Sequence, residues 1–356
     1  MRRFKPEALH KIGCTLFEAA GCSTDDAKTV VDHLIESNLF GQDAHGTLRF
    51  YEYVDKIIEG SFDPSGKPTV IRDKGCTALI DGGGGFGQVS GRLAIEIAME
   101  KARQNGVGVV GVRNTSHVGR AGAYPLEAAR AGFVAMIFVN AGRLGRQIAP
   151  FGGIDGKLST NPLAFAAPRP DGEPILIDMT TSVVAEGKIR IANNKGEQVP
   201  EGWIIDHDGN PPTDPNDFLG DPPGAMLPLG GPVGYKGYGL GLMVELMGGL
   251  MGGEGTANGE RSFKSNGVLF TAYDPSFFTD EETYRSEIEG LIHHVTSSRP
   301  DPRIGEVLIP GELEFRTSEK RRKEGLAVDD GTWSKIAEVA QKVGLDPELW
   351  ENEVLK

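Results

Sequence analysis

Apolar residues recur with a helical period through the first forty positions of the chain. They return every three or four positions from 6 to 40, and a break at 21–24 divides this stretch into two predicted helices. Ser23 or Thr24 is the expected cap of the second helix. A third helix is predicted over 47–59, with its apolar residues on one face. We therefore expect a small helical unit at the N-terminus.

From residue 70 onward, short apolar runs alternate with helical segments. The runs are rich in valine and isoleucine, and they predict strands at 76–80, 107–113, 133–139, 163–167 and 174–178. Helices are predicted at 89–105, 120–131, 182–194 and 237–252. A long ordered loop is predicted at 206–235, and a last helical segment at 329–345 could pack back onto the N-terminal helices. This order predicts an α/β or α+β body.

Composition narrows the class of protein. A chain of 356 residues exceeds one ordinary core, so two domains are expected. The formal net charge of −13 argues against nucleic acid or an anionic membrane as a partner. Three cysteines without C-x-x-C spacing predict reduced thiols, and no run approaches the roughly 18 apolar residues of a membrane span. We expect a soluble, cytoplasmic protein with no membrane or nucleic-acid partner.

One glycine cluster matches a dinucleotide-binding fingerprint. Gly82, Gly84 and Gly87 satisfy G-x-G-x-x-G between a predicted strand and a predicted helix. A Rossmann turn is normally followed, about 20 residues on, by an acid that binds the ribose. Here the next strand, 106–112, is followed by Arg113, which an NADP site could use. The residues alone leave open whether this is a phosphate turn or a plain strand-to-helix turn.

Two histidine-centred segments carry the most reactive groups. In segment 43–49, His45 precedes a predicted helix and Arg49 stands in its first turn. In segment 116–122, His117 follows a strand in a glycine-interrupted loop whose backbone amides could receive an anion. Imidazole suits proton transfer near neutral pH because its pKa lies near 6.5. Each histidine could instead be an ordinary surface or core residue.

Further polar groups stand where predicted strands end. They occupy 159–162, 177–182 and 235–239, and ligand sites of α/β proteins gather at such positions. No metal site is indicated, because His293 and His294 are adjacent and no H-E-x-x-H occurs. The sequence also has no G-x-S-x-G elbow and no Walker lysine after a glycine loop.

In their order along the chain, these segments resemble the malate/L-lactate/sulfolactate dehydrogenase family. This non-Rossmann group also includes ureidoglycolate dehydrogenase, diketogulonate reductase and a cyclic-imine reductase. The resemblance covers nearly the whole chain and is carried by DAHGTLRFYEYV, GVGVVGVRNTSHVGRAG, APFGGIDGKLSTNPLAFAAP, ILIDMTTSVVAEGKI, VPEGWIIDHDG, GYKGYGLGLMVELMGGLMGG and VLIPGE. Each motif alone is weak, but seven in order are specific.

The resemblance implies an α+β protein with two parts. A helical domain would combine residues 1–68 and 317–356, and residues 69–316 would form a non-Rossmann α+β NAD(P)-binding domain with a mixed sheet. Members are typically homodimers, in some cases higher oligomers, with the active site near the subunit interface. The implied activity is that of an NAD(P)-dependent dehydrogenase or reductase. It moves a hydride between nicotinamide and a 2-oxo or 2-hydroxy acid, with NAD as the cofactor and NADP possible.

The resemblance also assigns roles to residues of this sequence. His117 would be the acid/base, His45 would orient or polarise the substrate, and Arg49 would pair with its carboxylate. The implied substrate-binding residues are Arg49, Tyr53, Thr160 and Gly187. The implied cofactor-binding residues are His117, Gly119, Arg120, Ala121, Asn140, Asp178, Met179, Thr180, Lys236, Pro310, Gly311 and Glu312. This assignment moves the cofactor away from the glycine fingerprint, and no metal is implied.

Three departures from the family pattern leave the substrate open. Ala44 replaces a common serine, Glu186 stands where an arginine is common, and Tyr235 replaces a common histidine. The nearest alternatives are a cyclic-imine reductase and a ureidoglycolate-type dehydrogenase of the same family. A non-catalytic nucleotide-binding protein is an alternative of another class. A metal-dependent hydrolase that uses His45 and His117 is a further one.

Overall fold

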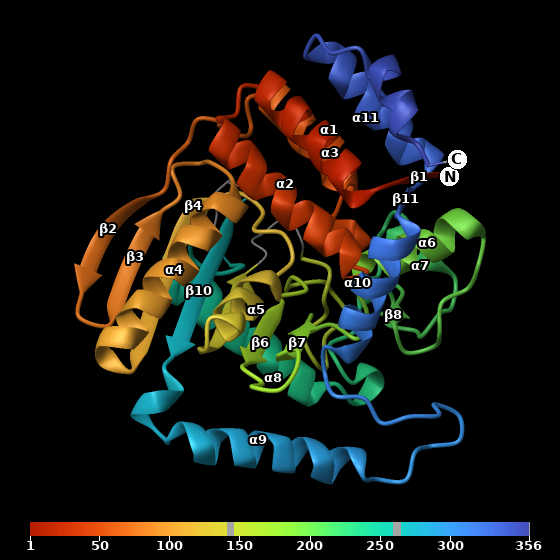
Figure 1. Cartoon of the computed structure of the whole chain (residues 1–356). Coiled ribbons are helices and arrows are strands. Elements are labelled where there is room, and N and C mark those ends of the chain that lie inside the picture. Colours follow the sequence, from red (N-terminus) through yellow and green to blue (C-terminus); the bar gives the residue numbers. More distant parts are fainter. Residues whose placement is uncertain (141–145, 259–264, 356) are drawn as a thin grey trace.

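The computed structural model describes residues 1–140, 146–258 and 265–355, and its centre is a mixed sheet (Figure 1). The sheet has seven strands in the order β2-β3-β4-β10-β5-β6-β7. Their bounds, in that order, are Thr69–Lys74, Thr77–Asp81, Val107–Thr115, Asn266–Tyr273, Val134–Asn140, Leu163–Ala167 and Ile175–Met179. Only β3 and β4 pair in parallel, and the other neighbours are antiparallel. The predicted non-Rossmann α+β fold is therefore confirmed.

Helices cover both faces of this sheet. The first face packs against α4 (Gly87–Asn105) and α5 (Ala123–Arg130), through alanines of both helices and alternate residues of the strands. The other face packs against α8 (Tyr235–Val244) and the π-helical segment η4 (Glu245–Met251). Strand β10 is buried along its length because it lies between β4 and β5 with helices above and below.

The N-terminal helices and the C-terminal segment form one helical layer at one end of the sheet (Figure 1). Its elements are α1 (Pro6–Ala19), α2 (Thr24–Leu39), α3 (Leu48–Ile58), α10 (Glu312–Glu324) and α11 (Asp330–Lys342). Strand β1 (Arg2–Phe4) pairs with β11 (Leu326–Val328), so both termini lie together. Phe4 packs against Trp333 with ring centroids 4.8 Å apart. The predicted return of the last helix onto the N-terminal ones is confirmed.

The remaining elements are short or peripheral. They are η1 (Asp43–His45), α6 (Glu186–Lys195), β8 (Ile204–Ile205), α7 (Pro215–Leu219), β9 (Ala225–Met226), η3 (Gly231–Val233), η5 (Pro275–Phe277), α9 (Glu281–Thr296) and η6 (Pro347–Glu353). No helix in the described part of the chain is long and apolar enough to cross a membrane.

The elements predicted from the pattern all form, with shifted ends. Ser23 caps α2, since its side chain accepts a hydrogen bond from the backbone N–H of Asp26. The helix predicted at 120–131 begins only at Ala123, and the one predicted at 182–194 begins at Glu186. The pattern did not predict β2, β10, α9 or α10, and the segment predicted as a long loop at 206–235 contains the short elements α7, β9 and η3. The limits of the two domains stay predictions.

A candidate active site between the helical layer and the strand ends

The site lies where the helical layer meets one edge of the sheet. Register places the end of β4, the start of β10, the end of β5 and the start of β6 at this same edge. We call His45, Arg49 and Tyr53, from η1 and α3, the helical wall. We call His117, Asn140, Thr160 and Asp178, from segments at the strand ends, the strand-end wall.

The turn that carries His45 is fixed by neighbouring side chains. Asn38 of α2 accepts a hydrogen bond from the backbone N–H of Thr47 (2.7 Å) and donates one to Asp43 (2.6 Å). Arg321 of α10 holds the same Asp43 carboxylate with two hydrogen bonds of 2.5 and 3.0 Å. A side chain at Gly46 would place its Cβ 2.2 Å from the Asn38 amide, so only glycine fits this turn.

The two histidines of the site stack on one another. The ring centroids of His45 and His117 lie 5.1 Å apart, with 12° between the ring planes. Nδ1 of His117 lies 2.6 Å from the Tyr53 hydroxyl, which also accepts a hydrogen bond from Nε2 of Gln88 (3.1 Å). Nδ1 of His45 is buried without a hydrogen-bond partner, and no described residue bonds Nε2 of His117. Two ring nitrogens are thus left for a bound molecule.

Burial and nearby cations keep both imidazoles neutral at neutral pH. Burial, together with the Arg49 and Arg120 guanidiniums, lowers the pKa of His45 to about 3. Burial and the charge of Arg49 also lower the pKa of His117 well below its usual 6.5. A neutral imidazole can accept a proton, so the site as it stands favours a base at His117.

Arg49 is oriented before any substrate binds. Its Nε donates to the backbone carbonyl of Ala44 (2.8 Å), and its guanidinium pairs with Glu52 of the same helix. The first turn of α6 borders this region, since a Cβ at Gly187 would lie 3.9 Å from that of Ala44. Glu186 of that turn is paired with Arg190 of its own helix (2.8 Å), which offsets its charge beside the site.

Several residues predicted to bind the cofactor come together beside β7. Asp178 accepts a hydrogen bond from the backbone N–H of Gly122 (3.0 Å), so the His117 loop is tied to the strand that leads to Met179 and Thr180. Pro310 accepts one from the backbone N–H of Leu176 (3.0 Å), which brings 310–312 to the same strand. Segments that are far apart in the sequence and are predicted to line the cofactor are therefore neighbours.

Two of the predicted cofactor residues have further partners, although Arg120 also pairs with Asp178 of the predicted set (3.8 Å). The Arg120 side chain is buried, bonds Glu36 of α2 (2.7 Å) and lies over the Phe40 ring, 4.5 Å from its centroid. Its side chain thus links the loop to the helical layer. Lys236 stands at the start of α8 with its ammonium 5.8 Å from the centroid of the Tyr235 ring. No hydrogen bond or ion pair ties Lys236 to the other predicted cofactor residues in the described part of the chain.

The glycine fingerprint forms a strand-to-helix turn whose backbone amides are occupied. Its N–H groups donate within the protein: Gly82 to Arg113 O (2.9 Å), Gly83 to Asp81 (3.0 Å), Gly84 to Asn114 O (2.9 Å), Gly85 to Gly82 O (3.1 Å) and Gly87 to the Ser116 hydroxyl (3.0 Å). A Cβ at Gly87 would lie 2.4 Å from the backbone oxygen of His117. These glycines let α4 pack directly against the His117 loop, and they do not offer free amides to a phosphate.

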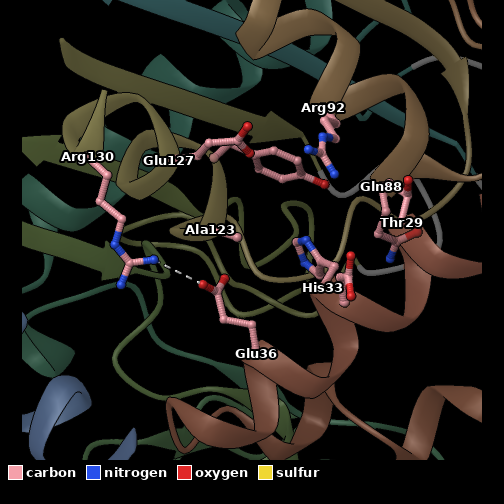
Figure 2. Close-up of a pocket in the computed structure, with 10 residues that line it drawn as sticks. Thr29, His33, Glu36, Gln88, Arg92, Ala123, Glu127 and Arg130 are labelled. Atoms are coloured by element: carbon pink, nitrogen blue, oxygen red, sulfur yellow. Dashed lines mark ion pairs between the residues drawn. The ribbon is translucent and has the colours of Figure 1, made fainter. Parts of the chain in front are cut away.

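A cavity of about 290 Å³ lies behind the His117 loop, among α2, α4 and α5 (Figure 2). Its lining includes His33, Gln88 and Tyr124, and each of them makes a hydrogen bond to a residue of the site or of the His117 loop. His33 accepts a hydrogen bond from the backbone N–H of Arg120 (2.8 Å), and Tyr124 donates one to the backbone oxygen of Val118 (2.5 Å). Sequence reasoning missed these residues. Polar side chains at core positions of predicted helices were the available signal.

Metal ligands are not grouped here. Within residues 1–140, 146–258 and 265–355, no set of three or more His, Cys, Asp or Glu side chains is arranged to hold a metal ion.

Comparison with known proteins gives the chain its family. A model of the malate/L-lactate dehydrogenase family matches residues 4–337. A malate dehydrogenase from Pyrococcus abyssi is 38% identical over 351 residues, which cover 96% of this chain and 95% of that protein. The solved sulfolactate dehydrogenase from Methanocaldococcus jannaschii aligns with a TM-score of 0.87 at 35% identity, covering 97% of this chain and 98% of that one. A Δ1-piperideine-2-carboxylate reductase from Pseudomonas syringae aligns with a TM-score of 0.83 at 26% identity, covering 96% and 100%. By sequence and by fold, the chain belongs to the malate/L-lactate dehydrogenase family of oxidoreductases.

Proposed function

We propose that this protein transfers a hydride between a nicotinamide cofactor and a 2-oxo or 2-hydroxy acid. The observation that carries the proposal is the stacked pair of neutral histidines beside an oriented arginine, with one nitrogen of each ring unbonded. Such a site offers a proton acceptor and a cation for a carboxylate within one small space. Dehydrogenases of this family use nicotinamide, which supplies or accepts the hydride when it is bound.

His117 is proposed as the acid/base, acting through Nε2. When a hydroxy acid is oxidised, its 2-carbon gives up a hydride, and the hydroxyl proton passes to Nε2 of His117, leaving a 2-oxo acid and an imidazolium. Reduction reverses each transfer. Nδ1 then keeps its proton in both states and donates a hydrogen bond to the Tyr53 hydroxyl, 2.6 Å away.

This assignment gives a role to the Gln88 amide. With Nδ1 of His117 as donor, the Tyr53 hydroxyl must donate its own hydrogen bond to another group. Gln88 is its other neighbour. Oε1 of Gln88 is buried and has no hydrogen-bond partner in the described part of the chain. A half-turn of the amide brings Oε1 to the phenol, so that the Tyr53 hydroxyl gains an acceptor and Oε1 gains a donor.

Arg49 and His45 are proposed to hold the substrate. The planar guanidinium of Arg49 suits a carboxylate, and its bonds to Ala44 and Glu52 preset its direction. His45 is neutral, so it can donate one hydrogen bond to the substrate oxygen without adding charge. A bound carboxylate would also offset the Arg49 charge, which raises the pKa of His117 and favours its protonated form during reduction.

The finer assignments follow the same proposal. We propose NAD as the cofactor, with NADP as its alternative, along the segments at 117–121, 140, 178–180, 236 and 310–312. Thr160 and Gly187 complete the substrate pocket. A homodimer is proposed because α8 and η4 expose a row of apolar side chains, namely Leu242, Met243, Leu246, Leu250 and Met251. The three cysteines are free, in keeping with a cytoplasmic location.

A cyclic-imine reductase is the second candidate. The alignment with the Pseudomonas syringae reductase over 96% of the chain favours it, because the same scaffold carries that enzyme. Protonation of an imine nitrogen would place the same demand on His117 as protonation of an alkoxide.

The test is a screen of reduced cofactors against candidate acceptors. NADH or NADPH is mixed with pyruvate, oxaloacetate, sulfopyruvate or Δ1-piperideine-2-carboxylate, and the nicotinamide absorbance is followed. His117→Ala should lower turnover by roughly 10²- to 10⁴-fold, the usual worth of a general acid/base. His207→Ala, in an exposed loop, is the control. Full turnover by His117→Ala would refute its role, and binding of nicotinamide without oxidation by any acceptor would favour a non-catalytic nucleotide-binding protein.

A further inference from the structure

A line of buried polar side chains connects the His117 loop to the ends of the strands. The backbone N–H of Val118 donates to the side-chain oxygen of Asn266 (3.1 Å). The side-chain amide of Asn266 donates to the backbone oxygen of Asn140 (3.0 Å), whose own side-chain amide donates to Oε2 of Glu245 (2.8 Å). The residue after the proposed acid/base is thus linked, through two asparagines, to one carboxylate.

The line continues on the other side of that carboxylate. Oε1 of Glu245 accepts a hydrogen bond from the side-chain amide of Asn161 (2.8 Å), and Oε2 also accepts one from the backbone N–H of Ala257 (2.9 Å). The Thr181 hydroxyl donates to the backbone oxygens of Thr160 (3.1 Å) and Asn161 (3.2 Å). Thr181 directly follows the proposed cofactor residues at 178–180. The line therefore reaches both the proposed cofactor and substrate segments.

The members of this line are almost fully removed from solvent. Asn266 is 7% exposed, Glu245 4%, Thr181 3%, Asn140 1% and Asn161 0%. Glu245 is their only charged side chain, and its two oxygens accept hydrogen bonds from three N–H donors. A carboxylate carries no hydrogens, so it can accept from all three at once, and a glutamine in its place would turn N–H groups toward a donor.

The glycines of η4 bring Glu245 to this position. Glu245 is the first residue of the π-helical segment, which lies against the ends of β5 and β10. A Cβ at Gly248 would lie 2.7 Å from the backbone nitrogen of Asn140, and one at Gly249 would lie 2.9 Å from its side-chain nitrogen. Only glycine allows this approach, and π-helical turns recur at functional sites.

We propose that Glu245 is a positioning residue for the proposed reaction. Its carboxylate is bonded to Asn140, Asn161 and Ala257, so it acts through these residues. It fixes Asn140 and the segment at Thr160 relative to the His117 loop, so that the hydride and proton transfers meet at one bound molecule. The inference rests on the proposed hydride transfer, and it assigns to the buried carboxylate a role in geometry rather than in proton transfer.

Glu245→Gln is the first test, with Asp26→Asn as its matched control. Asp26 is also buried (6% exposed) and paired, but it lies in the helical layer away from the line. We expect Glu245→Gln to lower kcat by roughly 10- to 100-fold and to raise the Kd for NADH, read from nicotinamide fluorescence, by roughly 10-fold, with a smaller change in the KM of the 2-oxo acid. Glu245→Asp, which keeps both oxygens, should recover part of the loss. Asp26→Asn should change none of these values by more than about twofold, whatever it does to the melting temperature.

Asn266→Ala is the second test. It can still refute the inference if the Glu245→Gln variant does not fold. It removes the bonds of Asn266 to Val118 and to the Asn140 backbone but leaves the Asn140 and Asn161 side chains on Glu245, so kcat should fall while the Kd for NADH stays near that of the wild type. Hydrogen exchange of the peptide covering 115–122 should quicken in both variants, and this readout does not depend on turnover.

The outcomes separate the two proposals. A wild-type protein that oxidises no reduced nicotinamide overturns the proposed function. An active wild type whose Glu245→Gln and Asn266→Ala variants keep kcat, NADH affinity and loop exchange within twofold overturns the positioning role. A loss of melting temperature without a change in these three readouts also overturns it, because the line would then be structural only.

Discussion

The two walls of the site are built in opposite ways. The helical wall comes from one stretch of eleven positions, 43–53, and its side chains stand on a 3-10 turn and the helix that follows it. The strand-end wall takes its residues from segments spread between 117 and 178, and several of them are joined by buried hydrogen bonds that pass through Asn266 and Glu245. One wall is local in sequence, and the other exists only once the sheet has formed.

The walls also differ in charge. The helical wall supplies the cation, Arg49, which is half-buried and already bonded to Ala44 and Glu52. The strand-end wall presents a neutral imidazole and buried amides, while its carboxylate, Asp178, and the neighbouring Glu245 are bonded to partners inside the protein. On the proposed function, this difference would be a division of work, in which the helical wall binds the substrate anion and the strand-end wall sets the geometry of transfer.

Removing the cation of the helical wall should give the largest effect. Arg49→Ala is expected to lower kcat/KM for a 2-oxo acid by roughly 10²- to 10³-fold, mainly through KM, because a buried charge pair with the carboxylate is lost. Arg49→Lys should recover only part, since lysine keeps the charge without the planar fork. Steady-state kinetics measure both.

Arg316→Ala is the control for this loss, as Arg316 lies exposed on α10 and pairs with Glu306 (2.6 Å). It should leave both constants within twofold. A loss in Arg49→Ala that lies in kcat alone would mean that the helical wall does not bind the anion, and the division of work would fail.

Breaking the contact between the walls should cost less. Tyr53→Phe removes the hydroxyl that holds Nδ1 of His117 and Gln88, and we expect kcat to fall by roughly 10- to 100-fold with KM little changed. Tyr51→Phe, on the same helix but packed against Lys335, is the control and should be near wild type. If Tyr53→Phe instead raised KM alone, Tyr53 would be a substrate ligand, as the family resemblance implies.

The helical wall was largely predictable from sequence, because its groups follow local rules. His45 precedes a predicted helix and Arg49 stands in its first turn, so the sequence already places them close together. The helices and the five strands predicted from 76 to 178 form for the same reason: their periodicity and bounding glycines act over short stretches.

The strand-end wall could not be predicted in full. Strand β10 lies between β4 and β5 although more than a hundred residues separate it from either. No local sequence pattern indicates that it pairs with these two strands. Its Asn266 meets Asn140 only through this pairing. The glycine fingerprint misleads for a related reason. Its amides donate to Arg113 and Asn114 of β4 and to Ser116 just after it, and spacing alone does not reveal these bonds.

The pH profile tests whether the charge of one wall acts on the other. Burial and Arg49 lower the pKa of His117 below 6.5, so the base is neutral and ready throughout the neutral range. For oxidation of a 2-hydroxy acid, kcat/KM should therefore stay flat as pH falls through about 6.5 and decline only at lower pH. Arg49→Ala removes a nearby positive charge, so the decline should move to higher pH, by roughly one pH unit or less. A wild-type decline centred at 6.5 or above would contradict the proposed influence of the helical wall on His117.

The smallest effect is expected at the rim of the helical wall. Ala44→Ser restores the serine common in the family. It tests whether a hydroxyl beside His45 adds a proton relay that raises turnover. The position is exposed, and its backbone oxygen is already bonded by Arg49, so the new hydroxyl changes neither the turn nor the guanidinium. Its oxygen would gain at most a single neutral hydrogen bond to His45, about 1 kcal/mol, which corresponds to a few-fold change in kcat/KM. Ser61→Ala, at another exposed position, serves as the control for handling and folding. A rise in kcat of more than about tenfold in Ala44→Ser would show that the helical wall takes part in proton transfer, and the division between a binding wall and a transfer wall would have to be given up.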